Sequence, residues 1–501
     1  MVGKTGSGKT TLINTLINHL LGVKFEDEIW YEITEENKEK AHISQTSEIT
    51  VYEVFIEEKP TSLTIIDTPG YGNTKGIEKD AEIAEYLRRL FSDEDGIHYI
   101  DAVCFVMKAS ENRLTGEELY IFHSVLSLFG KDIENNIVFL LTHSDGLPPT
   151  DALNAIEKAD IPCRRDEDNE PVYFLFNNRQ KEKRDKHHKH AYRSAWEMGE
   201  RSMHEFFKIL EEKNRKSVQM TLDVLKERTR LDACVYNLRE RITEKEKTMK
   251  ELSQIQEALR QNRDKIKNCE NFVITVEKGV KEKVLIENEW WWNSNATCCS
   301  VCEENCHVWS CWCANDPSKC EVMVKGFCTV CTGKCHHSKH VKENKKYEIR
   351  LKKIEMTFDA LKKAYGDTSD PPKTSFDKNV FENTKKEHES NIKESEDKSR
   401  TEECLTRDLE KIESQKSILV HETYTIIISL CKIALKADSA STLQHLDFLI
   451  PRLKEEKGKE EWVKKLEDLK KAGEEQKNNG AVRHVMNKFL ASFGLSTCQT
   501  E

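Results

Sequence analysis

Short apolar runs alternate with amphipathic stretches along residues 1–180. The apolar runs are LTIIDT, DAVCFVMKA, NNIVFLLTH and PVYFLFNN, whereas EIAEYLRRLF and ELYIFHSVLSLF carry apolar residues at helical spacing. Short buried strands that alternate with amphipathic helices are typical of a mainly parallel α/β sheet. We therefore predict an α/β domain over residues 1–180, whose last strands end in polar side chains.

The pattern changes to a longer period after a polar linker at residues 181–199. Residues 200–278 contain neither glycine nor proline, and apolar residues recur mostly three, four or seven positions apart. These residues are Leu231, Val235, Leu238, Ile242, Met249, Leu252, Leu259, Ile266, Cys269, Val273, Val276 and Val280. We interpret residues 200–289 as an outgoing coiled-coil helix, 343–436 as returning helical segments and 437–501 as a C-terminal helical bundle.

The composition indicates several units rather than one core. At 501 residues the chain exceeds the roughly 250 to 300 residues at which a single core stops growing. Its charged fraction of 33% suits long solvated helices, and its net charge of −10 gives no general attraction to nucleic acid. The sequence shows no long apolar run, anchor or lipidation motif. We expect a cytoplasmic protein without a nucleic-acid partner, and membrane association is unsupported.

The N-terminal stretch MVGKTGSGKTT fits the phosphate-loop pattern GxxxxGK[ST]. Glycines let backbone amides curl around phosphates, Lys9 reaches the β and γ oxygens, and the Thr10 hydroxyl can bind Mg²⁺. The segment TLINTLINHLL that follows predicts an amphipathic helix. The predicted nucleotide-binding residues of this loop are Gly3, Gly6, Ser7, Gly8, Lys9, Thr10 and Thr11.

The strand that should feed this loop consists here of Met1 and Val2. A central strand of two residues would leave backbone groups of its neighbours unpaired and part of the core exposed. We therefore expect that Met1 is an internal methionine of a longer natural chain, or that the gene model is short. Stable, stoichiometric nucleotide binding by the 501-residue form would contradict this expectation.

Two further motifs predict magnesium and γ-phosphate contacts. LTIIDTPG ends a strand with Asp67, which would act on the water shell of Mg²⁺, and with Gly70, whose amide would meet the γ-phosphate. The segment AHISQTSEITVYEV lies between this motif and the phosphate loop. We choose Thr46 as its magnesium-binding switch threonine, with Thr50 as the alternative.

The ends of two later strands predict the base site. NNIVFLLTHSDG places Thr142, His143 and Asp145 in a variant of the [NT]KxD box, whose carboxylate accepts hydrogen bonds from guanine. PVYFLFNNR places Asn177 and Asn178 after the next strand, where they can touch the base. These residues favour guanine over adenine.

These motifs, together with FVMKASENRLTGEELYIFHSVLSLFG, resemble the septin-related AIG-type G domains, the group that contains the immunity-associated GIMAP GTPases. The resemblance covers about residues 1–180 and implies a GTP/GDP switch that hydrolyses GTP and dimerises through its nucleotide face. Tyr71 stands where Ras-type GTPases place a catalytic glutamine, so we expect slow intrinsic hydrolysis. The candidate catalytic residues are Lys9, Thr10, Thr46, Gly70 and Arg113. An ordinary surface position is the alternative for Arg113.

Ten of the seventeen cysteines lie between Cys298 and Cys335. CCSVCEENCH and FCTVCTGKCHH share the pattern C-x2-C-x3-C-H 29 residues apart, and we call these two segments the cysteine phrases. Their thiol and imidazole groups are spaced as in zinc sites. We predict a zinc module over residues 290–342 that binds at least two ions and depends on them for stability. Its candidate ligands are Cys299, Cys302, Cys306, His307, Cys311, Cys313, Cys320, Cys328, Cys331, Cys335, His336 and His340. Their pairing stays open, and buried free cysteines or disulfides are the alternative.

The leading functional hypothesis is a GTP-dependent switch or assembly GTPase. It would form a homodimer or homo-oligomer through the G domain and the coiled coil, and it would act on a protein partner that the sequence does not identify. A GTP-bound scaffold with little turnover is the alternative. A chromosome-maintenance-type ATPase with a zinc hook is disfavoured because no second ATPase half follows the returning segments. A RING-type ubiquitin ligase is disfavoured because the cysteine phrases form a tandem repeat with surplus ligands.

Overall fold

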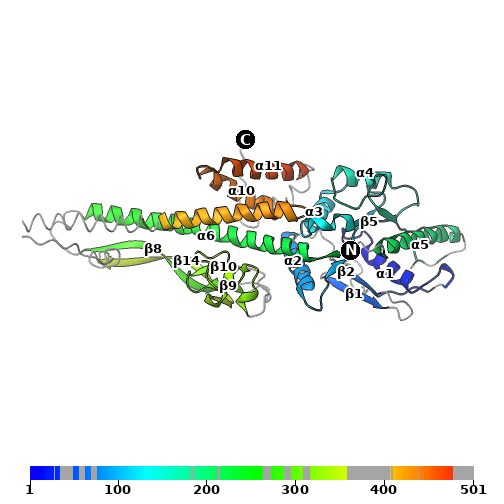
Figure 1. The fold of residues 1–501 in the computed structure, drawn as a ribbon, viewed down its shortest axis with the longest axis horizontal. Coiled ribbons are helices and arrows are strands. Elements are labelled where there is room, and N and C mark those ends of the chain that lie inside the picture. The colour runs from blue at the N-terminus through cyan, green and yellow to red at the C-terminus, as the bar shows by residue number, and fades with distance from the viewer. Residues whose placement is uncertain are drawn as a thin grey trace, which may run out of the picture. The chain divides into compact units, whose positions relative to one another are not determined.

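The computed structural model describes most of the chain, which divides into two compact units (Figure 1). One unit is Met1–Arg228 with Ile427–Glu501, and the other is Thr229–Ile426. The described residues are 1–27, 29–33, 49–55, 62–68, 76–180, 182, 184, 187–211, 215–262, 272–286, 295–308, 316–357, 407, 410–437 and 439–477. Within these ranges, no helix is long and apolar enough to cross a bilayer.

The first unit contains the parallel sheet that the apolar runs predict. Strands β4 (Val103–Lys108), β5 (Ile137–Thr142) and β6 (Tyr173–Leu175) pair in parallel in the order β4-β5-β6. Every residue of β5 is buried, as expected for a central strand that is covered on both faces. The sheet is mixed rather than wholly parallel, because β1 (Thr50–Phe55) pairs antiparallel with β2 (Ser62–Asp67).

Met1 and Val2 connect the hairpin β1–β2 to the parallel strands. The Val2 amide donates to Cys104 O at 2.9 Å, and Val2 O accepts from the Val106 amide at 2.7 Å. On the other side, the Met1 amine donates to Ile66 O at 2.8 Å. At these two positions the neighbouring strands are therefore paired; the expectation of unpaired groups concerns the remainder of those strands and stays a prediction. The side chain of Val2 is also buried.

Helices cover both faces of this sheet because strand residues alternate between the faces. Helices α1 (Lys9–Leu20) and α5 (Lys189–Glu211) pack on the face that carries Val106 and Leu140. Helices α2 (Gly76–Ser92), α3 (Gly116–Leu126) and α4 (Thr150–Lys158) pack on the face that carries Phe105 and Phe139. The short elements of this unit are η1 (Phe25–Asp27), β3 (Tyr99–Ile100), η3 (Lys131–Asn136) and β7 (Lys216–Ser217).

The predicted linker at residues 181–199 is wrong in its second half, where α5 begins at Lys189. The helix buries Met198, Met203 and Phe206, so its apolar face packs although its first turn is highly polar. The predicted C-terminal helices are confirmed as α10 (Ala440–Lys454) and α11 (Glu460–Lys477). Residues 478–501 of the predicted bundle lie outside the described residues.

The second unit corrects the predicted continuous outgoing and returning helices. Helix α6 (Gln219–Gln261) ends well before residue 289, and β8 (Val273–Leu285) pairs antiparallel with β14 (Lys345–Thr357) over thirteen residues. Thus Val273, Val276 and Val280 of the predicted helical seam lie on a strand, as do the first residues of the returning segment. The high content of β-branched residues in VITVEKGVKEKVL favours a strand over a helix. A helix over residues 410–433 agrees with the remainder of the prediction.

The coiled-coil seam is only partly covered within this chain. Leu231, Val235, Leu238 and Leu259 are buried, whereas Met249 on the same helix is 51% exposed. Ile266 and Cys269 of the predicted seam lie outside the described residues. A coiled coil formed with another chain therefore stays a prediction.

The cysteine-rich segment folds into small strands. Strands β9 (Ala296–Cys299), β10 (Glu304–Val308) and β13 (His340–Glu343) form a sheet in the order β10-β9-β13, and β11 (Met323–Val324) pairs with β12 (Phe327–Cys328). Two short helices, η5 (Pro317–Lys319) and η6 (His337–Lys339), connect them. The side-chain amide of Asn237 on α6 donates to Asn305 O at 2.7 Å, and this hydrogen bond joins the segment to the helix.

Candidate nucleotide site and metal clusters

The phosphate loop has the backbone geometry that its glycines allow. Gly8 has φ 94°, a left-handed conformation that other residues rarely adopt, and it precedes α1 without a side-chain cap. A Cβ atom on Gly3 would lie 2.3 Å from the Val106 carbonyl oxygen, so only glycine fits there. The first amides of α1 therefore meet no capping side chain and no acidic residue in the first turn, as an anion site requires.

Lys9 and Asp67 bring opposite charges into the buried end of this site. The Lys9 ammonium donates to Gly3 O at 2.8 Å and to Lys4 O at 3.2 Å. Burial lowers the pKa of Lys9 and raises the pKa of Asp67, and the charge of each residue opposes the shift of the other. The loop carbonyls hold the Lys9 ammonium where phosphate oxygens would replace them.

Three buried oxygen atoms at the predicted site have no hydrogen-bond partner among the described residues. They are Ser7 Oγ in the phosphate loop, Asp67 Oδ1 at the end of β2 and Asn178 Oδ1 after β6. Buried polar atoms are nearly always satisfied in folded proteins, so an unpaired group calls for a ligand, water or ion. Each of the three belongs to a motif predicted to contact phosphate, magnesium or the base.

Thr142 ties the base-recognition strand to the phosphate loop. Its hydroxyl donates to Ser7 O at 2.6 Å, and the Nδ1 atom of His143 lies 3.0 Å from the Thr142 hydroxyl oxygen. Because that hydroxyl gives its hydrogen to Ser7, His143 must be the donor in the second bond. Within the predicted base-recognition motif, Thr142 therefore positions the phosphate loop, and its hydroxyl is not available to contact a base.

Asp145 and Asn177 lie on adjoining loops at the carboxyl ends of β5 and β6. The side-chain amide of Asn177 donates to Ser144 O at 2.9 Å, and the backbone amide of Ser144 donates to Phe176 O at 3.0 Å. Asp145 is exposed and accepts a hydrogen bond from the Leu147 amide at 3.0 Å. One carboxylate oxygen of Asp145 takes that bond, and the exposed group can still accept hydrogen bonds from a base.

The remaining predicted residues of this site are placed unevenly. Thr46 and Gly70, together with Tyr71, lie outside the described residues. The alternative switch residue Thr50 is the first residue of β1. Arg113 is exposed in the loop before α3, in agreement with either reading of that residue.

Two buried asparagines of α1 escaped the sequence prediction. The Asn18 side chain donates to Tyr31 O at 2.7 Å and accepts from the Tyr31 amide at 2.9 Å. The Asn14 side chain accepts from the Ile33 amide at 3.1 Å. They fix the backbone that leads toward the segment containing Thr46. Two asparagines four residues apart on an apolar helix face were the available signal.

Comparison with known proteins identifies the domain that contains this loop. The model of the AIG1 family matches residues 1–193. Residues 1–193 form an AIG1 family domain. The match supports GTP binding and GTPase activity, and it extends the predicted boundary at residue 180 into α5. None of the curated proteins compared with the chain matches it significantly.

Similar solved structures include three of Toc33 from Arabidopsis thaliana. One is a complex with GDP and Mg²⁺ at 15% identity and a TM-score of 0.30, covering 43% of this chain and 84% of that chain. A dimerization-deficient mutant has 16% identity, a TM-score of 0.28 and the same coverage. A complex with Mg²⁺ and GMPPNP also has 16% identity and a TM-score of 0.28, covering 43% of this chain and 85% of that chain.

Outside the AIG1 domain, the cysteine-rich segment brings potential metal ligands together in three groups. Within each group the ligand atoms lie within 4.8 Å of one another. The groups are Cys299, Cys302, Cys331 and Cys335; Cys306, Cys328, Cys331 and His340; and His307, Cys320 and Glu321. The two cysteine phrases are therefore interleaved in space and do not form two tandem sites.

The groups also correct the predicted ligand set. Exposed His336 belongs to none of them, and its Nδ1 atom lies 3.0 Å from Ser338 Oγ. Glu321 joins His307 and Cys320 although the sequence prediction considered only cysteines and histidines. Cys311 and Cys313 lie outside the described residues.

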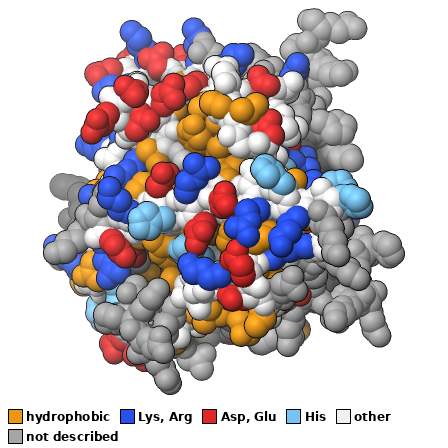
Figure 2. All heavy atoms as spheres, turned by 90° about the vertical axis from the view of Figure 1, so that its right-hand side faces the viewer, with side chains coloured by type: hydrophobic (Ala, Val, Ile, Leu, Met, Phe, Trp, Pro, Cys, Tyr) orange, Lys and Arg blue, Asp and Glu red, His pale blue; other side chains and the backbone are white. Residues whose placement is uncertain are grey.

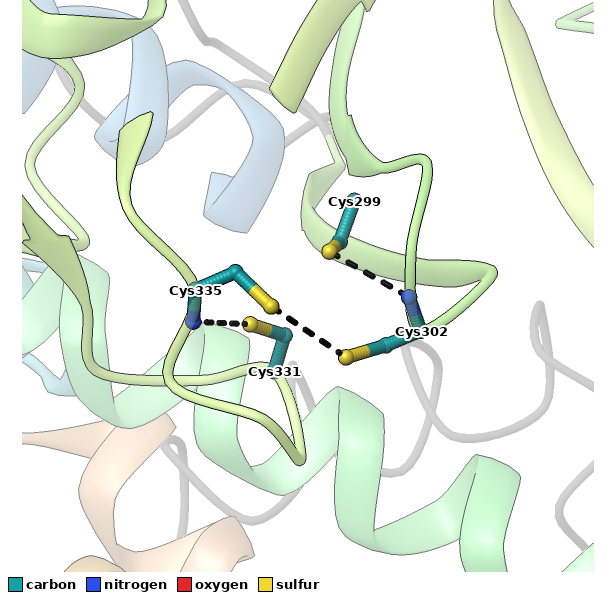
Figure 3. Close-up of side chains that lie close together, drawn as sticks. All are labelled: Cys299, Cys302, Cys331 and Cys335. Atoms are coloured by element: carbon teal, nitrogen blue, oxygen red, sulfur yellow. Dashed lines mark hydrogen bonds between the residues drawn. The ribbon is translucent and has the colours of Figure 1, made fainter. Parts of the chain in front are cut away.

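Backbone amides point at the sulfur atoms of these groups. The Cys302 amide donates to Cys299 Sγ at 3.4 Å, and the Cys335 amide donates to Cys331 Sγ at 3.2 Å (Figure 3). The Cys331 amide likewise donates to Cys328 Sγ at 3.4 Å. A hydrogen bond from the Cys306 thiol lowers the pKa of Cys328, whereas burial raises the pKa of Cys306. The amide donors contribute in favour of the thiolate, which is the form that binds metal.

His340 presents a bare ring nitrogen to the second group. Its Nδ1 atom lies 3.1 Å from His336 O, so Nδ1 carries the hydrogen and Nε2 keeps its lone pair. Nε2 is buried and has no hydrogen-bond partner in the described part of the chain. A metal-binding histidine typically donates its other ring N–H to a backbone carbonyl in this way. The second group therefore fits a zinc ion.

Proposed function

We propose that the AIG1 domain is a guanine-nucleotide switch with slow intrinsic GTP hydrolysis that dimerises through its nucleotide face. The observation that carries the proposal is that two buried oxygen atoms, Ser7 Oγ and Asp67 Oδ1, have no hydrogen-bond partner among the described residues. They lie beside Lys9 at the start of α1, which has no capping side chain. A nucleotide with Mg²⁺ would satisfy both atoms. The magnesium ion would neutralise phosphate charge, and Thr10 and Asp67 are the described residues suited to hold it.

In this proposal the affinity for nucleotide comes from direct contacts with the phosphate loop rather than from long-range attraction by surface charge. Figure 2 shows a face on which Lys and Arg side chains are interspersed with Asp, Glu and hydrophobic side chains. A mixed face of this kind does not attract polyphosphates from a distance. Lys9 and the first amides of α1 hold the phosphates, while Thr142 keeps the loop in place through Ser7.

Base choice rests on Asp145 and Asn177. The exposed carboxylate of Asp145 can accept from the N1 and N2 hydrogens of guanine, whereas adenine offers no matching pair of donors. The segment with Thr46 and Gly70 would respond to the γ-phosphate, and Arg113 would reach the partner's nucleotide face in a homodimer. A GTP-bound scaffold with little turnover is the second form of this proposal.

We further propose that the cysteine-rich segment binds zinc and that zinc holds its small strands together. The segment offers thiolates and a prepared histidine but few aliphatic residues with which to build a core. The AIG1 domain would switch, and the helices and zinc module that follow would present the surface for a protein partner in the cytoplasm.

Asp145→Asn tests the guanine site. The substitution removes charge-assisted hydrogen bonds worth about 1.5–3 kcal/mol each, so GTP should bind about a hundredfold more weakly or worse. Xanthosine triphosphate should bind better to the variant than to the natural protein, because an amide can donate to the xanthine carbonyl. Asp151→Asn, in the exposed first turn of α4, is the matched control and should change neither affinity.

Two results would each contradict one part of the proposal. Adenine nucleotide in the purified protein, identified by mass spectrometry, would overturn the guanine assignment. GTP turnover per molecule that stays constant across protein concentrations, and is unchanged by Arg113→Ala, would remove the dimer. A turnover close to zero with tight GTP binding would favour the scaffold.

A further inference from the structure

Cys331 belongs to two ligand groups at once. It stands with Cys299, Cys302 and Cys335 in one group and with Cys306, Cys328 and His340 in the other. Its side chain is fully buried, at 0% exposure. Together the two groups comprise six cysteines and one histidine, which is one ligand fewer than two separate four-coordinate sites require.

The second group is complete only if it keeps Cys331. Cys306, Cys328, Cys331 and His340 make a four-ligand set, and His340 has its Nε2 lone pair ready. The first group then has three cysteines of its own. Within the described segment no other side chain joins it, since exposed His336 stands apart and His307 belongs to the third group.

One sulfur–sulfur distance in the first group matches that expected around a tetrahedral metal ion. The sulfur atoms of Cys302 and Cys335 lie 3.7 Å apart (Figure 3). Four sulfurs placed about 2.3 Å from one zinc ion are about 3.8 Å from each other. Backbone amides donate to the sulfur atoms of Cys299 and Cys331 in this group.

We propose that the Cys331 thiolate bridges two zinc ions, so that the two groups form one binuclear cluster of six thiolates and one imidazole. This inference rests on the proposed zinc binding. A thiolate sulfur has several lone pairs and can bind two ions, and each ion then has four ligands. Six thiolates and two Zn²⁺ leave a formal charge of −2, which the amide donors to sulfur offset in part.

Zinc K-edge X-ray absorption on the full-length zinc-loaded protein tests the bridge without any substitution. Two ions that are each about 2.3 Å from one sulfur must lie less than about 4.6 Å apart, and about 3.8 Å at a tetrahedral angle. We expect a zinc–zinc distance in that range. Bound zinc without such a distance would overturn the bridge and leave zinc binding intact, whereas absence of zinc would refute the zinc proposal itself.

Metal counting on variants of the full chain gives a second, independent measurement. Cys331→Ala should lose two zinc equivalents relative to the natural protein, because both ions lose a ligand. Loss of one equivalent would indicate separate sites. Cys298→Ala is the matched control, since the neighbouring buried Cys298 donates to Asn305 Oδ1 at 3.4 Å and belongs to no ligand group. The third group is unchanged in both variants and cancels from the comparison.

Discussion

Replacing Thr142 by valine should weaken nucleotide binding without changing base preference. Valine keeps the volume and branching of threonine but removes the hydroxyl that donates to Ser7 O at 2.6 Å. The Ser7 carbonyl is then left without this donor inside a packed loop. The empty loop can turn the carbonyl toward water, whereas the nucleotide-bound loop must hold it in place, so the loss appears in binding.

The magnitude follows from that single unsatisfied acceptor. A buried acceptor that loses its partner costs about 1–3 kcal/mol, which corresponds to a Kd about 5- to 150-fold higher. The Thr142 hydroxyl oxygen lies 2.6 Å from Ser7 O, so the methyl group that replaces it must move away from that carbonyl, and the loss can exceed the cost of the missing hydrogen bond. GTP and GDP should be affected alike, because Ser7 belongs to the loop that both would occupy.

Isothermal titration with GTP, GDP and ATP measures both affinity and base preference. Thr142→Ser is the matched control, because it keeps the hydroxyl and should stay within about threefold of the natural protein. If valine and serine weakened binding equally, the hydrogen bond to Ser7 would not be the cause. If valine altered the ratio of GTP to ATP affinity, Thr142 would contact the base and the positioning role would be wrong.

Three other substitutions test the packing around the two sites. Gly3→Ala should abolish nucleotide binding and lower the Tm in thermal unfolding, because its Cβ would clash with the Val106 carbonyl oxygen. Gly199→Ala on α5 is the control and should raise or preserve the Tm, because no packing neighbour among the described residues lies within 4 Å of its Cβ. Asn18→Leu should destabilise the AIG1 domain by about 2 kcal/mol or more in urea unfolding, because two backbone groups lose their partner; an unchanged midpoint would contradict this. Arg241→Met should destabilise the cysteine-rich unit by about 3–5 kcal/mol, because Glu304 stays buried and charged. Adding Glu304→Leu should recover part of that loss in hydrogen exchange, and a loss in the double variant as large as in Arg241→Met would show that the buried charge of Glu304 is not the cause.

The placement of the candidate nucleotide-site residues at strand ends was largely predictable, because these residues follow strong local signals. Asp67 and Thr142 are the last residues of apolar strands, and parallel strands bring such ends to one edge of a sheet. The role of Thr142 was not predictable, since its bond to Ser7 crosses 135 residues of sequence. Nor was the contact between Asn18 and Tyr31, because a buried amide does not reveal its partner.

The hairpin β8–β14 was missed because its apolar residues satisfy two periods at once. Val273, Val276 and Val280 are spaced as on a helix, yet Ile274 and Val276 are the buried pair on β8. Alternating Tyr347, Ile349 and Leu351 on β14 was the signal for a strand. The ligand groups could not be read from order along the chain, because spatial grouping depends on how the strands pair.

The interleaved order of ligands has a consequence for how the protein is made. A ribosome adds about 5–20 residues per second, so the first cysteine phrase emerges seconds before the second. Neither ligand group can be completed until Cys331 and the residues after it have left the ribosome, since both groups contain ligands from each phrase. A chain truncated between Val308 and Cys328 would keep two of the four ligands of the first group and one of the four of the second, and it would complete neither. The cysteine-rich segment should therefore bind its metal ions and fold only after both cysteine phrases have been synthesised.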